Sequence, residues 1–244
     1  MENPHDDCQT NVIGTLNLLE ACRRTDDGQS GRAGEAVNTP PHPILPSPSR
    51  FVFASSNAPL GRQPPPATED KAPLPISPYG ASKLAGEGYC LAYHGSWGLG
   101  TVVLRFANVY GPYSLHKSSV VAQFFKDILS ERQITIDGDG RQTRDFIYVE
   151  DLCRAILLAL EANVSGEVLQ IATGEETSIL QLAETVQQVT GHSLEAHYGP
   201  ARRGDIRKNY STVTKASGAL GWKPETGLHD GLHITWQWFR KSVR

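Results

Sequence analysis

The chain has 244 residues, with 23 Lys and Arg against 26 Asp and Glu, which gives a formal net charge of -3. Apolar residues make up 39% of the sequence and charged residues 20%, a composition typical of a folded protein with one or two domains. The slightly negative charge and the absence of a basic run argue against nucleic acid as a partner. No apolar run approaches the ~18 residues of a membrane-spanning helix, so no membrane association is predicted.

The first ten residues are polar and acidic and match neither a secretory signal nor a transit peptide, which predicts a cytoplasmic location. The cysteines are scattered, without a Cys-x-x-Cys pair, and the histidines do not cluster. The sequence therefore predicts neither a metal site nor a disulfide framework.

The first predicted helix covers about residues 8–24, where apolar residues recur at helical spacing. A stretch rich in Gly, Pro and Ser follows at 26–49, and we interpret it as a flexible insertion. Gly28, Gly31 and Gly34 have the spacing of a dinucleotide-binding turn, but a polar run precedes them and prolines follow. These glycines are therefore assigned to the flexible insertion.

The next elements predict a βαβ unit. Residues 50–57 form an apolar strand that ends in small hydroxyl residues, and a helix at 78–94 and a strand at 101–106 follow. Ligand sites of parallel sheets form at the carboxyl ends of strands. Ser56 is thus placed to hydrogen-bond a substrate hydroxyl.

Tyr79 and Lys83 lie four residues apart near the start of the helix at 78–94, so their side chains share one helix face. An ammonium beside a phenol favours the phenolate and would lower a tyrosine pKa that is ordinarily about 10. Such a tyrosine can exchange protons near neutral pH, so we expect Tyr79 to act as an acid/base group. The same spacing is also that of two residues on a solvent-exposed helix face.

Helical and strand patterns alternate through the rest of the chain, which predicts an α/β fold with a parallel sheet. The expected helices cover residues 118–130, 149–162, 178–190 and 228–240, and the expected strand covers 168–172.

Seven motifs follow one another along the chain, including Ala54-Ser55-Ser56 and Tyr79-Gly80-Ala81-Ser82-Lys83. In this order they resemble the extended short-chain dehydrogenase/reductase family, in its NAD-dependent nucleotide-sugar epimerase and dehydratase branch. The resemblance spans nearly the whole chain. The motifs lie at residues 11–21, 54–56, 79–83, 104–112, 138–149, 202–205 and 220–224.

The resemblance implies an N-terminally truncated Rossmann-type parallel sheet with a smaller C-terminal α/β substrate-binding domain. Residues 1–108 and 145–172 would be the remnant of the NAD-binding domain, and residues 109–144 and 173–244 would form the nucleotide-sugar-binding domain. Relative to the family, we expect the N-terminal glycine-rich dinucleotide-binding part to be absent, on the order of 60 to 90 residues.

The resemblance also assigns roles to individual residues. Ser56, Tyr79 and Lys83 would be catalytic, and Ser55, Tyr79 and Lys83 would contact the cofactor NAD. A nucleotide-sugar, in the first place a UDP-sugar, is the implied substrate. The guanidiniums of Arg144 and Arg202 would converge on the diphosphate of this substrate. Guanidiniums bind phosphate oxygens well, because their hydrogen bonds are bidentate and charge-assisted. The implied substrate-binding residues are Asn108, Lys117, Arg144 and Arg202.

The implied reaction is that of an isomerase, a UDP-sugar 4-epimerase, with Tyr79 as the acid/base. Tyr79 would take a proton from a sugar hydroxyl as the adjacent carbon gives hydride to NAD, and Lys83 would lower the Tyr79 pKa. No Asp-Glu pair follows Ser56 in the region where a dehydratase would place one, so epimerisation is favoured over dehydration.

Three alternatives stay open. The chain could be a decayed fragment of an epimerase, or an enzyme whose cofactor site is rebuilt around residues 26–49. It could also be a noncatalytic nucleotide-sugar-binding or dimerising module that pairs with an intact relative. By resemblance, the helices at 8–24 and 78–94 would form the interface of a homodimer or of such a pair.

Overall fold

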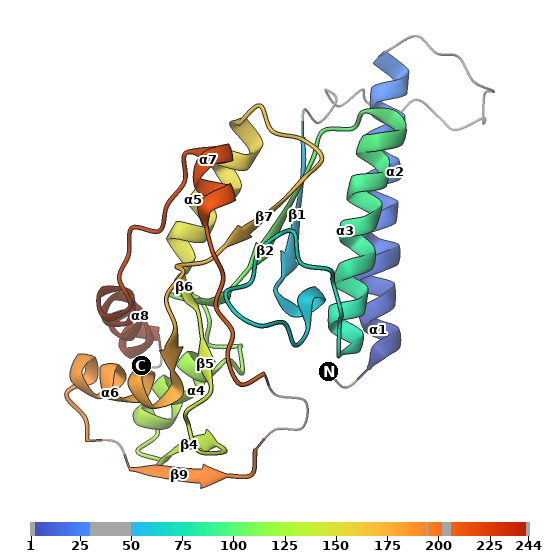
Figure 1. The fold of residues 1–244 in the computed structure, drawn as a ribbon. Helices are drawn as coiled ribbons and strands as arrows, with labels where there is room; N and C mark the ends of the chain where they lie inside the picture. The colour runs from blue at the N-terminus through green and yellow to red at the C-terminus, as the bar shows by residue number, and fades with distance from the viewer. Residues whose placement is uncertain (1–2, 30–49, 194, 202–205, 243–244) are drawn as a thin grey trace. The chain divides into compact units, whose positions relative to one another are not determined.

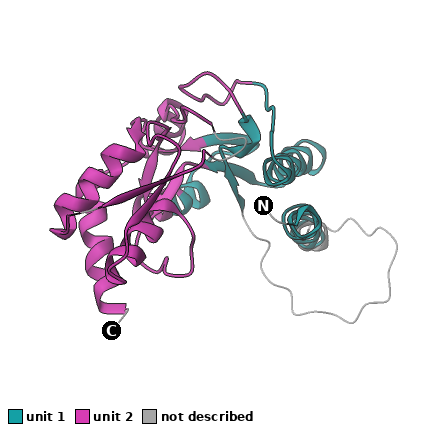
Figure 2. Ribbon diagram, turned by 90° about the horizontal axis from the view of Figure 1, so that it is seen from below, with its two compact units in different colours: residues 1–61, 72–105, 156–169 teal, residues 62–71, 106–155, 170–244 magenta. Residues whose placement is uncertain are grey.

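The computed structural model describes residues 3–29, 50–193, 195–201 and 206–242. The chain divides into two compact units (Figure 2). Unit 1 comprises residues 1–61, 72–105 and 156–169, and unit 2 comprises residues 62–71, 106–155 and 170–244. The assignment of a cofactor-binding and a sugar-binding domain stays a prediction.

The N-terminal part of unit 1 is helical from Pro4 to Gln29 and contains one π-helical segment. The predicted helix at 8–24 is therefore confirmed but is longer at both ends. The predicted flexible insertion is wrong for residues 26–29, because the helix continues through them, and residues 30–49 lie outside the described residues. The three segments are α1 (Pro4–Cys8), η1 (Gln9–Ile13) and α2 (Gly14–Gln29).

A three-stranded sheet has the order β1-β2-β7 (Figure 1). Helix α3 connects β1 to β2 in sequence, which is the arrangement of a parallel βαβ unit. The predicted α/β class with a parallel sheet is thus confirmed, and the strand predicted at 101–106 has its observed bounds. The elements are β1 (Phe51–Ser56), the short 3₁₀ turn η2 (Ala58–Leu60), α3 (Pro78–Trp97), β2 (Thr101–Phe106), α5 (Val149–Glu161) and β7 (Glu167–Ile171).

Helix α3 has defined start and stop signals. The Ser77 hydroxyl accepts a hydrogen bond from the Gly80 amide (3.0 Å), and Pro78 occupies the first helical turn. Gly98 ends the helix in the left-handed conformation, with φ of 71°. These caps place Tyr79 in the first turn of α3.

Helix α3 packs closely on both α2 and β1 (Figures 1 and 2). A Cβ atom on Gly86 would lie 2.4 Å from the Phe53 ring, so only glycine allows this approach. The buried side chains between these elements form the core of unit 1: Leu19, Phe53, Cys90, Tyr93, Leu99 and Val103.

The described residues of unit 2 form three two-stranded pairings, none of which the sequence predicted. The pairs β3–β6 and β4–β9 are parallel, and β5–β8 is antiparallel. Strands of two to four residues carry too short a pattern to be recognised before their partners are known. Their bounds are β3 (Asn108–Tyr110), β4 (Ile134–Asp137), β5 (Thr143–Arg144), β6 (Phe146–Tyr148), β8 (Thr177–Ser178) and β9 (Ala196–Gly199).

The helices of unit 2 supply its core. Phe125 lies with its ring centroid 5.4 Å from those of both Trp236 and Phe239, and this cluster joins two helices that are distant in sequence. The predicted helices at 118–130, 178–190 and 228–240 are confirmed, with ends shifted by up to two residues, and one further helix follows residue 213. The helices are α4 (Val120–Leu129), α6 (Ile179–Thr190), α7 (Thr214–Leu220) and α8 (Leu228–Ser242).

Two searches of the described residues were negative. None of their helices is long and apolar enough to cross a membrane. The same part of the chain contains no group of three His, Cys, Asp or Glu side chains arranged to hold a metal ion.

The close approach of α3 to β1 predicts that alanine substitutions at two glycines of α3 change the free energy of unfolding in opposite directions. Gly86→Ala is expected to lower the free energy of unfolding by about 1–3 kcal/mol, because the new methyl group would overpack against Phe53. Gly88 is exposed, and a Cβ there meets nothing within 4 Å, so Gly88→Ala is expected to stabilise the chain by about 0.5–1 kcal/mol. Urea unfolding of both variants measures the difference, and equal changes would contradict this packing.

Candidate active site

Ser56, Tyr79 and Lys83 come together in unit 1, where β1 ends and α3 begins. The Tyr79 phenol is hydrogen-bonded to the Ser56 side chain. Lys83 Nζ lies 5.9 Å from the centroid of the Tyr79 ring and 5.2 Å from that of the Phe53 ring. Residues from two elements thus form one polar cluster, as the strand-end argument predicted.

The Lys83 ammonium donates a hydrogen bond to the Ala54 carbonyl (3.0 Å). Burial lowers the pKa of Lys83 below its ordinary value, and the negative charge of Asp7 opposes this shift. An ammonium has three donors, so this group has capacity to bind a ligand hydroxyl beside Tyr79.

The pKa of Tyr79 is raised above its ordinary value, mainly because burial disfavours the charged phenolate. The hydrogen bond from Ser56 acts in the opposite direction, and the negative charge of Asp7 raises the pKa further. The predicted lowering of the Tyr79 pKa by Lys83 is therefore wrong for this structure. The ammonium is itself half-buried and is held by a backbone carbonyl, and burial of the phenol dominates.

Asp7 is a member of this environment that sequence reasoning missed. It lies in α1, and its charge acts on both Tyr79 and Lys83. Nothing in the sequence signals this proximity, because it depends on the packing of α1 against α3.

Ser55 occupies a different environment from its neighbour Ser56. Its side chain is buried, and its hydroxyl donates a hydrogen bond to Glu87 Oε1 (2.5 Å). The predicted contact between Ser55 and a cofactor stays a prediction, and the hydroxyl could only accept a hydrogen bond there, since its proton is donated to Glu87.

A pocket of about 300 Å³ in unit 2 brings together Asn108 and Arg144. Asn108 Nδ2 donates to the Asp145 carbonyl (3.2 Å). Arg144 Nη1 donates to the carbonyls of Thr143 (2.6 Å) and Ile206 (2.8 Å). Backbone carbonyls thus orient both predicted substrate-binding side chains at this pocket.

The N-terminus of α4 forms another part of the same pocket. Ser118, Ser119, Val120 and Val121 line it, and the N-cap residue Ser119 makes no side-chain capping bond. The positive end of the helix dipole and the amides of the first turn favour an anion.

The other two predicted substrate-binding residues do not join this pocket in the described structure. Lys117 is exposed and is not among the lining residues, and its carbonyl accepts a hydrogen bond from Lys126 (2.7 Å). Arg202 lies outside the described residues. Sequence reasoning missed Gln142, which lines the pocket and donates to the Asp137 carbonyl (2.7 Å), because this turn acquires its place only when β4 pairs with β9.

Asp145 caps a turn of the backbone beside Asn108 and Arg144. It accepts hydrogen bonds from the amide (2.8 Å) and hydroxyl (2.7 Å) of Thr173 and from the Gly174 amide (2.9 Å). Burial raises the pKa of this carboxyl, and the hydrogen bonds oppose that shift. This carboxylate fixes the backbone next to Asn108 and Arg144.

The described residues fit one end of a dinucleotide cofactor. Tyr79 and Lys83 offer a hydroxyl and a half-buried ammonium, donors suited to the hydroxyls of a ribose. Within the described ranges, no apolar strand runs through a glycine-rich turn into a helix, the arrangement that binds a pyrophosphate.

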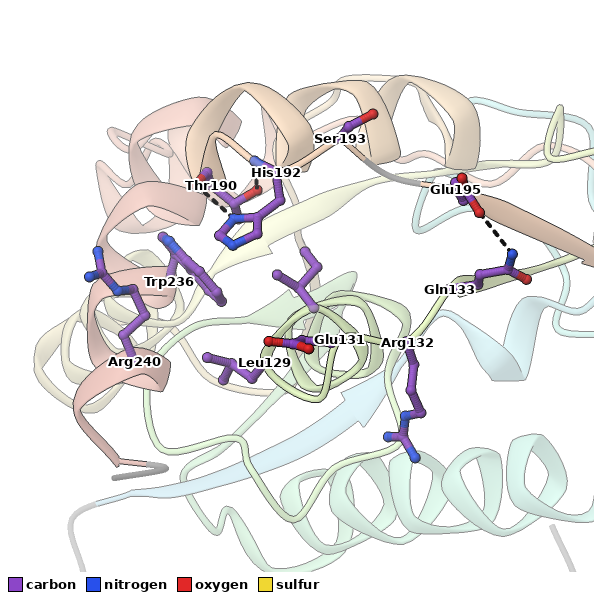
Figure 3. Close-up of a pocket in the computed structure, with 11 residues that line it drawn as sticks. Leu129, Glu131, Arg132, Gln133, Thr190, His192, Ser193, Glu195, Trp236 and Arg240 are labelled. Carbon is purple, nitrogen blue, oxygen red and sulfur yellow. Dashed lines mark hydrogen bonds between the residues drawn. The ribbon is translucent and has the colours of Figure 1, made fainter.

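A second pocket of unit 2, of about 800 Å³, shares no lining residue with the pocket at Asn108 (Figure 3). Its walls carry both charge signs, from Glu131 and Glu195 and from Arg132 and Arg240. Gln133 Nε2 donates to Glu195 Oε2 (2.9 Å). The pocket at Asn108 also contains a carboxylate, Asp137, but only there does the N-terminus of a helix, α4, line the pocket beside an arginine, so the smaller pocket is the better candidate for a diphosphate.

Comparison with known proteins identifies the family of this chain. Residues 1–172 match the model of the NAD dependent epimerase/dehydratase family. A putative UDP-glucose 4-epimerase of Methanocaldococcus jannaschii is 35% identical over 248 residues, which cover 100% of this chain and 73% of that protein.

Solved structures with the same fold include a UDP-glucose 4-epimerase from Thermotoga maritima with UDP-glucose. It has a TM-score of 0.85 and 36% identity, and the match covers 99% of this chain and 73% of that one. A UDP-glucuronic acid 4-epimerase from Bacillus cereus, in complex with UDP-glucuronic acid and NAD, has a TM-score of 0.80 and 30% identity over 95% of this chain and 68% of that one. From its motifs, its fold and these relatives, the chain belongs to the NAD-dependent epimerase/dehydratase family.

Proposed function

We propose that this chain acts on UDP-sugars as a 4-epimerase with NAD as cofactor. The observation that carries the proposal is the hydrogen-bonded Tyr79–Ser56 pair with Lys83 one helical turn away. The relatives with solved structures include 4-epimerases of UDP-glucose and UDP-glucuronic acid, one of them in complex with both its UDP-sugar and NAD.

In this proposal Tyr79 and Ser56 act on the sugar. The Tyr79 phenolate takes the proton of the 4-hydroxyl as hydride leaves C4, and Ser56 donates a hydrogen bond to the same oxygen. NAD, when bound, supplies the hydride acceptor and donor. After the sugar turns over, Tyr79 returns the proton to the oxygen, and C4 has the opposite configuration.

Lys83 holds the cofactor end of the site, through hydrogen bonds from its ammonium to ribose hydroxyls. Asn108, Arg144 and the first turn of α4 hold the substrate diphosphate, because a guanidinium and free helix amides both favour phosphate oxygens. Lys117 and Arg202 are further proposed contacts. Residues 1–108 and 145–172 serve the cofactor, and residues 109–144 and 173–244 serve the sugar nucleotide.

The function is tested by incubating the purified chain with NAD and UDP-glucose and following UDP-galactose by chromatography. Turnover is expected, and Tyr79→Phe is expected to lower kcat by about 100-fold or more, because the acid/base group is lost. Tyr198→Phe, at an exposed position of β9, is the matched control and should retain wild-type activity.

Calorimetry with UDP-glucose tests the binding site separately from turnover. Arg144→Gln is expected to weaken binding by about tenfold or more, because a charge-assisted hydrogen bond is lost. Arg240→Gln, in the other pocket of unit 2, should leave binding unchanged. Binding without turnover would support the noncatalytic binding module instead, and neither binding nor turnover would contradict both.

The charges around Tyr79 predict opposite effects of two substitutions on its pKa. The pKa of the phenol lies above its ordinary value in the wild type, mainly because of burial. Ser56→Ala should raise this pKa further, since a donor to the phenolate is lost, and Asp7→Asn should lower it, since a nearby negative charge is removed. Tyrosinate absorbance, with the Tyr79→Phe titration subtracted, measures both shifts. Shifts of the same sign would refute this account.

We further propose a homodimer, or a pair with an intact relative, formed through the helical segment α1–α2 and helix α3. Large apolar side chains on these helices are exposed, among them Leu18 (59%) and Trp97 (54%). Sedimentation equilibrium of the purified chain is expected to show a dimer that Leu18→Glu weakens. A wild-type monomer at micromolar concentration would contradict the homodimer.

A further inference from the structure

Three residues of α3, each one turn apart, contact consecutive positions of β1. Tyr79 is hydrogen-bonded to Ser56, Lys83 Nζ donates to the Ala54 carbonyl, and Glu87 Oε1 accepts from the Ser55 hydroxyl. The spacing i, i+4, i+8 keeps all three on one face of the helix. The first two belong to the candidate active site, and the Glu87–Ser55 contact has no role there.

Glu87 is also the partner of a buried arginine. Arg105 on β2 donates through Nε to Oε1 (2.9 Å) and through Nη2 to Oε2 (2.6 Å), and both side chains are at most 4% exposed. The Oε1 atom of Glu87 therefore binds Arg105 and Ser55 at once. Through this single carboxylate, helix α3 is joined to both β1 and β2.

We propose that Ser55, Glu87 and Arg105 are positioning residues that set the place of the Tyr79 phenol against Ser56. The expected effect on turnover rests on the proposed epimerase function. The expected effect on the position of the Tyr79 phenol rests on the contacts alone. None of the three side chains needs to touch substrate or cofactor.

The geometry explains why a buried polar contact is used at this point. Side chains alternate along a strand, so Ser55 shares with Phe53 the face of β1 that packs on α3. A slip of one residue between α3 and β1 would turn Ser55 away from Glu87 and move Ser56 away from Tyr79. Apolar contacts such as that of Phe53 with Gly86 favour a close approach of α3 to β1. They fix the position of the helix along the strands less strongly than the directional hydrogen bonds of the bidentate Arg105–Glu87 pair.

Ser55→Ala tests the inference, because it removes the contact to Glu87 and leaves the ion pair with Arg105 intact. Thr101→Val is the matched control, since it removes another buried hydrogen bond between β2 and α3, from Thr101 Oγ1 to the Cys90 carbonyl (2.9 Å), farther along the helix. The first readout uses no ligand: the NMR signal of ¹³Cζ-labelled Tyr79, assigned by its loss in Tyr79→Phe. The second readout is kcat and KM for UDP-glucose.

In Ser55→Ala, the Tyr79 signal should shift, and kcat should fall by up to about 100-fold with little change in KM, because a misplaced group costs rate more than affinity. Thr101→Val should change neither quantity. An unchanged Tyr79 signal in Ser55→Ala would overturn the inference, and so would equal changes in both variants. If the signal shifts only in Ser55→Ala but the wild type shows no turnover, the positioning role stands and the epimerase proposal fails.

Glu87→Gln alone would leave Arg105 as an unpaired buried charge, which risks unfolding. The double variant Glu87→Met and Arg105→Met removes both charges at similar volume and serves as the second test. It is expected to fold and to shift the Tyr79 signal as Ser55→Ala does. A folded double variant with the wild-type signal would overturn the role of the ion pair.

Discussion

The contact between α3 and β1 controls the geometry of unit 1, because Ser56, Tyr79 and Lys83 all belong to one of these two elements. Gly86 lets the helix approach the strand, and the Arg105–Glu87 pair fixes it there. Burying two charges costs several kcal/mol for each ion, which the pairing roughly offsets. Arg105 Nη1 has no hydrogen-bond partner in the described part of the chain, so this pair is better understood as a geometric constraint than as a source of net stability.

The electrostatics at Tyr79 follow from the same packing. Burial and the Asp7 charge both raise the phenol pKa, and the Ser56 hydrogen bond offsets only part of this. In the described state the tyrosine therefore carries its proton at neutral pH. A cation placed near the phenol would favour the phenolate, so the readiness of this group to take a proton depends on what binds beside it.

Of the two pockets of unit 2 at Asn108 and at Trp236, the smaller one, at Asn108, is better suited to a diphosphate. Volume alone would favour the pocket at Trp236 and Arg240, but its walls mix carboxylates and guanidiniums. The pocket at Asn108 also contains a carboxylate, Asp137, but it combines a helix N-terminus with Arg144, and both of these favour an anion. Asp145 fixes the neighbouring backbone by accepting several hydrogen bonds at a single carboxylate.

The sequence by itself determined the α/β class, the long helices and the residues of the Tyr79 cluster. Local periodicity and caps define elements such as the helix that begins after Ser77, and Tyr79 and Lys83 share a face because helix geometry requires it. Tertiary structure alone decided which short strands pair, as β4 does with β9, since three or four residues carry too little pattern. It also decided that Asp7 and Glu87 act near Ser56 and that the Tyr79 pKa rises, because burial and the approach of distant charges depend on packing.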